Sequence, residues 1–125
     1  MRTALIVLTA LTLVSCAPGE GPFSPYAWQG VTQTQFGTNA LRLVYTRYGD
    51  TVIGSYYVGT TTTPTGKAEG YIDGDTIVLE LSRTTSCTID FLGTISENRI
   101  VGAHVPRAGC STISDPAGTW DLLRK

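Results

Sequence analysis

Histidine, charged residues and catalytic motifs are all scarce in this chain. Its 125 residues include one histidine, and only 15% are charged, with nine Lys and Arg against ten Asp and Glu. One histidine excludes a histidine-rich metal site and leaves His104 as the sole base for a Ser-His-Asp triad. Gly-rich phosphate loops and the Cys-x-x-Cys, His-Glu-x-x-His and Gly-x-Ser-x-Gly motifs are also missing. We therefore expect a protein that is not an enzyme and that uses neither a metal nor a cofactor.

The distribution of charged residues and the composition further restrict the kind of protein that this chain can be. The cations are scattered singly, so the sequence shows no basic patch of the kind that holds nucleic acid. Glycine is abundant, at 14 residues, and threonine is frequent, which suits β-structure and argues against helices. The length favours a single domain.

The first sixteen residues have the layout of an export signal. A short cationic start precedes the uncharged apolar stretch 4–14, which is too short to span a bilayer but has the length of a signal-peptide core. The sequence Leu-Val-Ser-Cys then ends at Cys16 and resembles the lipobox of bacterial lipoproteins. This resemblance implies that the signal peptide 1–15 is removed and that Cys16 becomes the lipidated first residue. An ordinary secretory signal with a chance cysteine is the alternative.

The segment after this cysteine predicts a short tether. Residues 17–25 contain three prolines and two glycines and show no apolar periodicity. Such a segment reaches at most about 30 Å when extended. We therefore expect residues 16–26 to hold a domain at 27–125 close to a membrane. Ala17 lacks the aspartate associated with inner-membrane retention in many diderm bacteria, so the resemblance to lipoproteins implies the outer membrane if the cell has one.

The cysteine count supports the same interpretation. Three cysteines in an exported chain leave one unpaired unless one of them has another role. If Cys16 carries the lipid, Cys87 and Cys110 remain as a pair. The compartment beyond the inner membrane is oxidising enough to bridge them, so we predict a disulfide between the two.

A pattern that occurs three times organises the rest of the chain. Gly-Asp at 49, Gly-Asp at 74 and Glu-Asn at 97 each precede an apolar, β-branched run. Such pairs are hairpin signals, because Gly, Asn and Asp tolerate positive φ. The alternation predicts eight strands, at 27–35, 40–46, 52–58, 67–72, 76–82, 87–95, 99–105 and 118–124. An open sheet would leave two exposed edges, so we expect an all-β, eight-stranded antiparallel up-and-down barrel.

Both ends of the predicted barrel resemble the calycins, the group that contains lipocalins and avidins. Trp28, preceded by Tyr26, is similar to the tryptophan of the lipocalin Gly-x-Trp motif, and 52–56 is similar to the second strand of avidins. Trp120 and Arg124 are similar to the closing lipocalin strand, whose cation packs over that tryptophan. The resemblance implies that Trp28 and Trp120 face inward on neighbouring strands, with Arg124 on the Trp28 indole.

His104 is the most interesting titratable group, because Gly-Ala-His at 102–104 repeats the register of Gly-Ser-Tyr at 54–56. If these repeats are equivalent, His104 and Tyr56 point into the barrel, as does Tyr45. The three would then line a ligand pocket near one mouth. A filled core in which they are hydrogen-bonded is the alternative, since eight-stranded barrels can be just wide enough for side chains.

Together these features favour a lipid-anchored cell-envelope protein that acts as a non-catalytic binding or interaction module. Tyr48, Tyr57 and Tyr71 are expected on the outer face, where they would suit an envelope protein as partner. Capture of a small amphipathic ligand in the barrel mouth is one alternative. A periplasmic protease inhibitor of lipocalin-like shape is another, in which residues 18–26 would insert into the enzyme.

Overall fold

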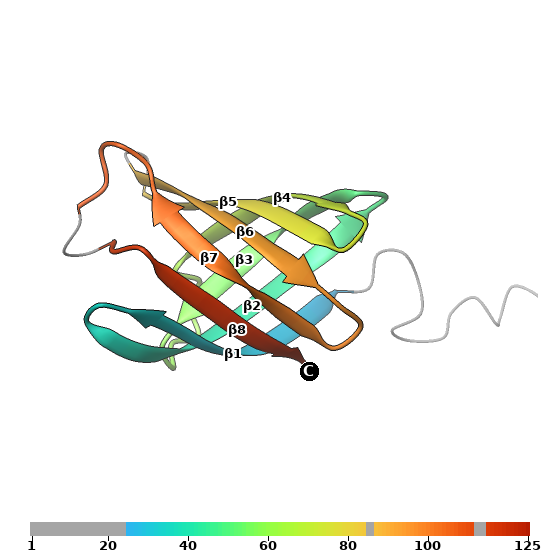
Figure 1. Ribbon diagram of the computed structural model, residues 1–125, viewed down its shortest axis with the longest axis horizontal. Helices are drawn as coiled ribbons and strands as arrows, with labels where there is room; N and C mark the ends of the chain where they lie inside the picture. Colours follow the sequence, from blue (N-terminus) through green and yellow to red (C-terminus); the bar gives the residue numbers. More distant parts are fainter. Residues whose placement is uncertain (1–24, 85–86, 112–114) are drawn as a thin grey trace, which may run out of the picture.

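Eight antiparallel strands close into one barrel (Figure 1). The computed structural model describes residues 25–84, 87–111 and 115–125. The strands are β1 (Tyr26–Thr34), β2 (Gly37–Tyr48), β3 (Thr51–Val58), β4 (Gly66–Asp73), β5 (Thr76–Thr84), β6 (Cys87–Ile95), β7 (Arg99–Pro106) and β8 (Gly118–Arg124). Each pairs with the next, and β8 pairs with β1. The predicted all-β up-and-down barrel is confirmed. Within the described ranges, no helix is long and apolar enough to cross a membrane.

The strand boundaries follow the hairpin signals closely. The ranges predicted at 87–95 and 118–124 are reproduced by β6 and β8. The largest difference is in β2, which begins at Gly37 rather than at 40 and ends at Tyr48 rather than at 46. Its first residues are polar and exposed at a barrel mouth, so they lack the apolar alternation by which a strand is recognised. Pairing with β1 makes them a strand all the same, because Thr34 faces Gly37 across the turn.

The barrel interior is an apolar core made by alternate residues of every strand. On β2, for example, Leu41, Leu43 and Tyr45 are buried, whereas the residues between them are only partly buried. This is the period of two expected of a sheet with one covered face. The side chains buried most completely are Trp28, Tyr45, Phe91, Leu41, Leu43, Ile77, Leu79, Leu81, Ile100, Leu122 and Val52.

Glycines on the inner face let neighbouring strands approach closely. A Cβ atom at Gly70 would collide with the carbonyl oxygen of Val78 on β5, and one at Gly102 would collide with that of Leu92 on β6. Both glycines share the inward parity of buried neighbours on their own strands. Small residues at these positions therefore permit the tight coiling that closes eight strands into a narrow barrel.

Closure brings the two ends of the domain together. Trp28 on β1 is 2% exposed and lies opposite Arg124 on β8, and Trp120 is 3% exposed, so both tryptophans face inward as predicted. The Arg124 guanidinium lies 5.5 Å from the centroid of the Trp28 ring and 4.7 Å from that of Tyr26. Tyr26 in turn stacks on Tyr45, with centroids 5.2 Å apart. One cation thus covers two rings of an aromatic cluster at this end of the barrel.

A disulfide joins Cys87 to Cys110, as predicted. It connects the first residue of β6 to the loop between β7 and β8, over a sequence separation of 23 residues. The bridge therefore restrains the long loop that precedes the closing strand.

Removal of this disulfide should lower stability without changing the fold. In the double variant Cys87→Ala with Cys110→Ala, we expect the free energy of unfolding to fall by about 3 kcal/mol, because the unfolded chain regains the freedom of a closed loop. Urea denaturation of variant and wild type measures the difference. The wild type treated with reductant should lose a similar amount, and unchanged midpoints in both experiments would contradict the prediction.

Candidate functional site: a cavity at one mouth of the barrel

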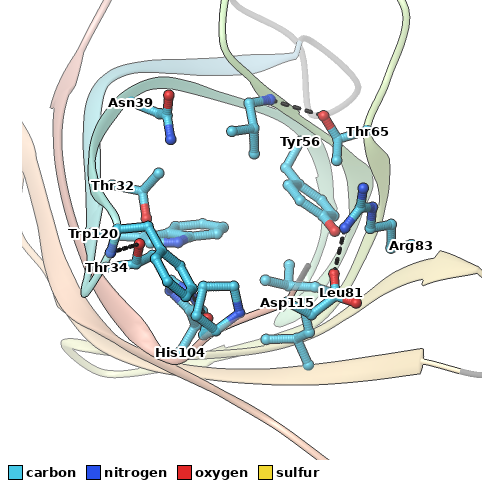
Figure 2. A pocket seen from close by; sticks show the side chains of 14 residues that line it. Thr32, Thr34, Asn39, Tyr56, Thr65, Leu81, Arg83, His104, Asp115 and Trp120 are labelled. Carbon is cyan, nitrogen blue, oxygen red and sulfur yellow. Dashed lines mark hydrogen bonds and ion pairs between the residues drawn. The ribbon is translucent and has the colours of Figure 1, made fainter. Parts of the chain in front are cut away.

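A cavity of about 420 Å³ opens at one end of the barrel (Figure 2). It lies beneath the β1–β2, β3–β4 and β7–β8 connections, at the end opposite Tyr26 (Figure 1). Leu81, Ile89 and Trp120 provide apolar wall, whereas Phe36 and Asn39 at the rim are exposed. Its volume lies within the range of roughly 300–1,000 Å³ that small-molecule pockets occupy.

Three residues that line this cavity each contain a buried polar atom that has no hydrogen-bond partner within the described protein. The atoms are Thr32 Oγ1, Tyr56 OH and His104 Nδ1, and their residues are 5%, 3% and 7% exposed. A buried polar group without a partner costs about 1–3 kcal/mol, and folded proteins contain few of them. All such atoms that the described residues contain belong to residues that line the same cavity. Unsatisfied polar groups are thus gathered in the walls around this end of the barrel.

Trp120 lies at the centre of the residues that line the cavity. Its ring centroid lies 6.2 Å from that of Tyr56 and 6.2 Å from that of His104, and Phe91 stacks against it at 4.4 Å. Barrel closure sets Thr32 directly opposite Trp120, since β1 pairs with β8. In Figure 2 the indole lies between Thr32 and His104 on one wall and Tyr56 on the facing wall. The cavity therefore has an aromatic floor with hydrogen-bonding groups on two sides.

The protonation of His104 follows from its one hydrogen bond. Nε2 lies 3.0 Å from the carbonyl oxygen of Pro116, which can only accept, so Nε2 carries the proton. Nδ1 of the neutral ring is then a buried acceptor that has no partner among the described residues. Burial lowers the pKa of His104 below its ordinary value of 6.5, and the bond to Pro116 opposes this in part. The ring is neutral at pH 7.

The remaining polar groups of the cavity are neutral or paired. Burial raises the pKa of the Tyr56 phenol, which therefore stays protonated. Arg83 at the end of β5 and Asp115 before β8 form an ion pair with an N–O distance of 2.6 Å across part of the mouth (Figure 2). Among the described residues that line the cavity, these two are the only ones with a formal charge at pH 7. The lining is thus polar but has no net charge.

Tyr45 does not belong to this site, which corrects the expectation that it shares a pocket with Tyr56 and His104. It lies at the other end of the barrel, where it accepts a hydrogen bond from Trp28 Nε1 at 3.3 Å and lines a separate cavity of about 280 Å³. Tyr45 pairs with Gly54, two residues nearer than Tyr56 to the β2–β3 turn. Alternation specifies the face on which a side chain lies but not its depth along the barrel.

Sequence reasoning missed Thr32, Arg83 and Asp115. Thr32 shares the inward parity of Trp28 on β1, so alternation along this strand was a usable signal for it. Nothing local marks Arg83 or Asp115, because they meet only when the loop before β8 folds over the mouth. No group of three or more His, Cys, Asp or Glu residues in the described ranges could hold a metal ion.

Two other groups of residues for which the sequence predicted a role lie outside this cavity. Tyr48 and Tyr71 are on the outer face and about half exposed, at 48% and 50%, whereas Tyr57 is partly buried beneath the guanidinium of Arg42 at 4.2 Å. Cys16 and most of the segment 18–26, proposed to insert into a protease, lie outside the described residues. The structure therefore leaves both the anchor and the inhibitor hypothesis as predictions.

Neutral His104 should make folding stability depend on pH. In the unfolded chain the ring binds a proton near pH 6.5, but in the folded protein its pKa is lower. The stability is therefore complete above pH 6.5 and falls as the pH drops from there through the folded pKa. Urea denaturation at pH 7.5 and pH 5 should show a larger loss for the wild type than for His104→Gln, which cannot titrate. Equal losses would contradict the assignment.

Comparison with known proteins found no relative of this chain. No protein-family model, curated protein or solved structure matches the chain. The resemblance to calycins therefore stays a prediction from short sequence motifs, and the function has to be inferred from the cavity itself.

Proposed function

We propose that this protein binds a small, uncharged, amphipathic molecule in the mouth cavity while a lipid on Cys16 anchors it to the cell envelope. The observation that carries the proposal is that Thr32, Tyr56 and His104, each with a buried polar atom that has no partner, all line one cavity of about 420 Å³. Such a combination of apolar wall and few polar groups is typical of small-molecule sites.

The alternative of a filled, hydrogen-bonded core fits the opposite end of the barrel better than this one. There, Tyr45 accepts a hydrogen bond from Trp28, and Arg124 covers Tyr26 and Trp28. At the mouth, by contrast, the polar atoms are not paired with one another. A core under selection for stability alone gains nothing from burying a histidine and a tyrosine in this way.

The end of the barrel at which β1 begins supports a ligand that enters the mouth from the aqueous phase rather than from the membrane. Tyr26, the first residue of β1, lines the cavity at the far end from the mouth. A lipid on Cys16 would therefore tether the barrel by the end that holds the aromatic cluster of Tyr26, Trp28 and Tyr45. The mouth would then face away from the membrane, which favours capture of a dissolved molecule over extraction of a lipid from the bilayer.

Binding at the mouth can be tested with the uncharged fluorophore N-phenyl-1-naphthylamine. We expect its fluorescence to rise on addition of the protein, and we expect Thr32→Phe to weaken binding at least tenfold, because the ring fills the cavity. Gln33→Phe is the matched control, since it places the same ring on the outer face of the same strand. Thermal melting shows whether each variant is folded. Equal affinity of a folded Thr32→Phe variant and the wild type would rule out the mouth as the site.

The anchor can be tested separately by Cys16→Ser expressed from the full-length chain. Serine cannot form the thioether that lipidation requires, so we expect the variant to remain uncleaved or to leave the detergent phase in a detergent-partitioning assay. Cys110→Ser retains Cys16 and should partition like the wild type. Partitioning of Cys16→Ser equal to that of the wild type would refute the lipid anchor.

A further inference from the structure

A row of mainly apolar residues crosses the outer face of the barrel from β2 to β7. Its members are paired directly from strand to strand, and they are Tyr48, Thr51, Tyr71, Val78, Leu92 and Ala103. Tyr71 is 50% exposed and Leu92 is 60% exposed. At about 4.8 Å per strand, the row is about 24 Å long when measured along the sheet. It therefore matches the length of a helix of about 16 residues.

Most of the exposed large apolar side chains gather at this row. The described residues include nine such side chains, and six of them belong to the row or lie two residues from a member of it on the same strand. These six are Tyr48, Ile53, Tyr71, Leu92, Val101 and Val105. Single apolar residues are normal on a protein surface, whereas a contiguous group marks an interaction site. The row is thus the centre of an apolar patch on the outer wall (Figure 1).

Carboxylates border this patch. Glu69, Asp73, Glu80 and Asp90 each lie two residues from Tyr71, Val78 or Leu92 on the same strand, and therefore on the same outer face. Three of the four, on β4, β5 and β6, are also paired directly with one another in a second row beside the first. Like charges in directly opposite positions of a sheet destabilise it. A cation from another molecule would relieve this repulsion.

The protein neutralises these carboxylates only in part. The Arg107 guanidinium donates hydrogen bonds to Asp90 at 2.7 Å and to Glu80 at 3.1 Å. Lys67 is the next outward residue of β4 beyond Glu69, but the described residues contain no ion pair with Glu69. Even with both cations counted, the four carboxylates outnumber them, so the border of the patch carries net negative charge.

We infer that this patch binds a basic amphipathic segment of a partner protein, with apolar side chains on the row and Lys or Arg side chains against the bordering carboxylates. Charge favours this occupant over the two others that an exposed apolar face could take. A second copy of the chain would bring the same carboxylates against each other in a symmetric contact. A bilayer that contains anionic lipids would be repelled by them.

Three fluorescently labelled peptides of about 16 residues test the chemistry of the partner by fluorescence anisotropy. One is an amphipathic helix of leucine and lysine, the second has glutamate in place of lysine, and the third has serine in place of leucine. We expect the leucine–lysine peptide to bind at least tenfold more tightly than either of the others, because it alone matches both the apolar row and the carboxylates. If the glutamate or the serine peptide binds equally well, the inference is wrong.

A matched pair of leucine variants locates the binding. Leu92 and Leu123 are both outward leucines, 60% and 59% exposed, but Leu123 on β8 pairs with Arg99 and Gln29 rather than with the row. We expect Leu92→Ser to weaken binding of the leucine–lysine peptide at least fivefold and Leu123→Ser to change it less than twofold. Thermal melting shows whether each variant is folded. Equal effects of the two substitutions in folded variants would contradict the location.

A matched pair of glutamate variants tests the charge without altering the apolar surface. Glu69→Gln removes a carboxylate beside the row, whereas Glu97→Gln removes one from the exposed connection between β6 and β7. We expect the first to weaken binding of the leucine–lysine peptide about threefold and the second to leave it unchanged, because only Glu69 lies beside the bound lysines. Unchanged affinity in Glu69→Gln would refute the role of the carboxylates.

The other two occupants are tested on the protein without peptide. We expect analytical ultracentrifugation to show no dimer that Leu92→Ser dissociates. We also expect flotation with phosphatidylglycerol vesicles to recover equal amounts of wild type and Leu92→Ser. The opposite results would assign the patch to a second copy or to a membrane and overturn the inference. Ligand binding at the mouth is a separate question, because the patch shares no residue with the lining of that cavity.

Discussion

Pairing between β1 and β8 is the constraint on which the rest of the structure depends. It closes the sheet, so that every strand has two neighbours and no edge is left as a template for aggregation. It also places the start and the end of the domain side by side: Trp28 lies opposite Arg124, and Thr32 lies opposite Trp120. The aromatic cluster at one end and one wall of the mouth cavity at the other both follow from this single ladder.

The size of the inward-facing side chains determines which parts of the barrel interior are filled and which are open. Eight strands enclose a space just wide enough to be filled, so large residues at mid-height close it completely. Phe91 stacked on Trp120 does so here. Nearer the mouth the inward positions of β1 and the β3–β4 region hold Thr32, Val58 and Thr65, which are too small to meet across the barrel. A cavity therefore remains at the mouth, next to the stacked rings of Phe91 and Trp120.

The two ends of the barrel use similar residue types in opposite ways. At the end near the chain termini, Tyr45 pairs with Trp28 and a cation covers the outer rings, so the polar atoms there are satisfied within the protein. At the mouth, Tyr56 and His104 present polar atoms that the described protein does not satisfy. One arrangement stabilises the fold. The other leaves buried polar groups without partners, which costs stability and is the feature that supports the proposed binding role.

The eight strands, the inward or outward face of the residues named above and the disulfide between Cys87 and Cys110 could all be predicted from the amino-acid sequence. This was possible because turn chemistry, alternation with a period of two and cysteine pairing are local or nearly local signals. Which inward residues lie at the same height in the barrel could be seen only in the folded molecule. That height depends on the register of all eight strands at once. It therefore separated Tyr45 from Tyr56, brought Thr32 to His104, and joined Arg83 to Asp115 across the mouth.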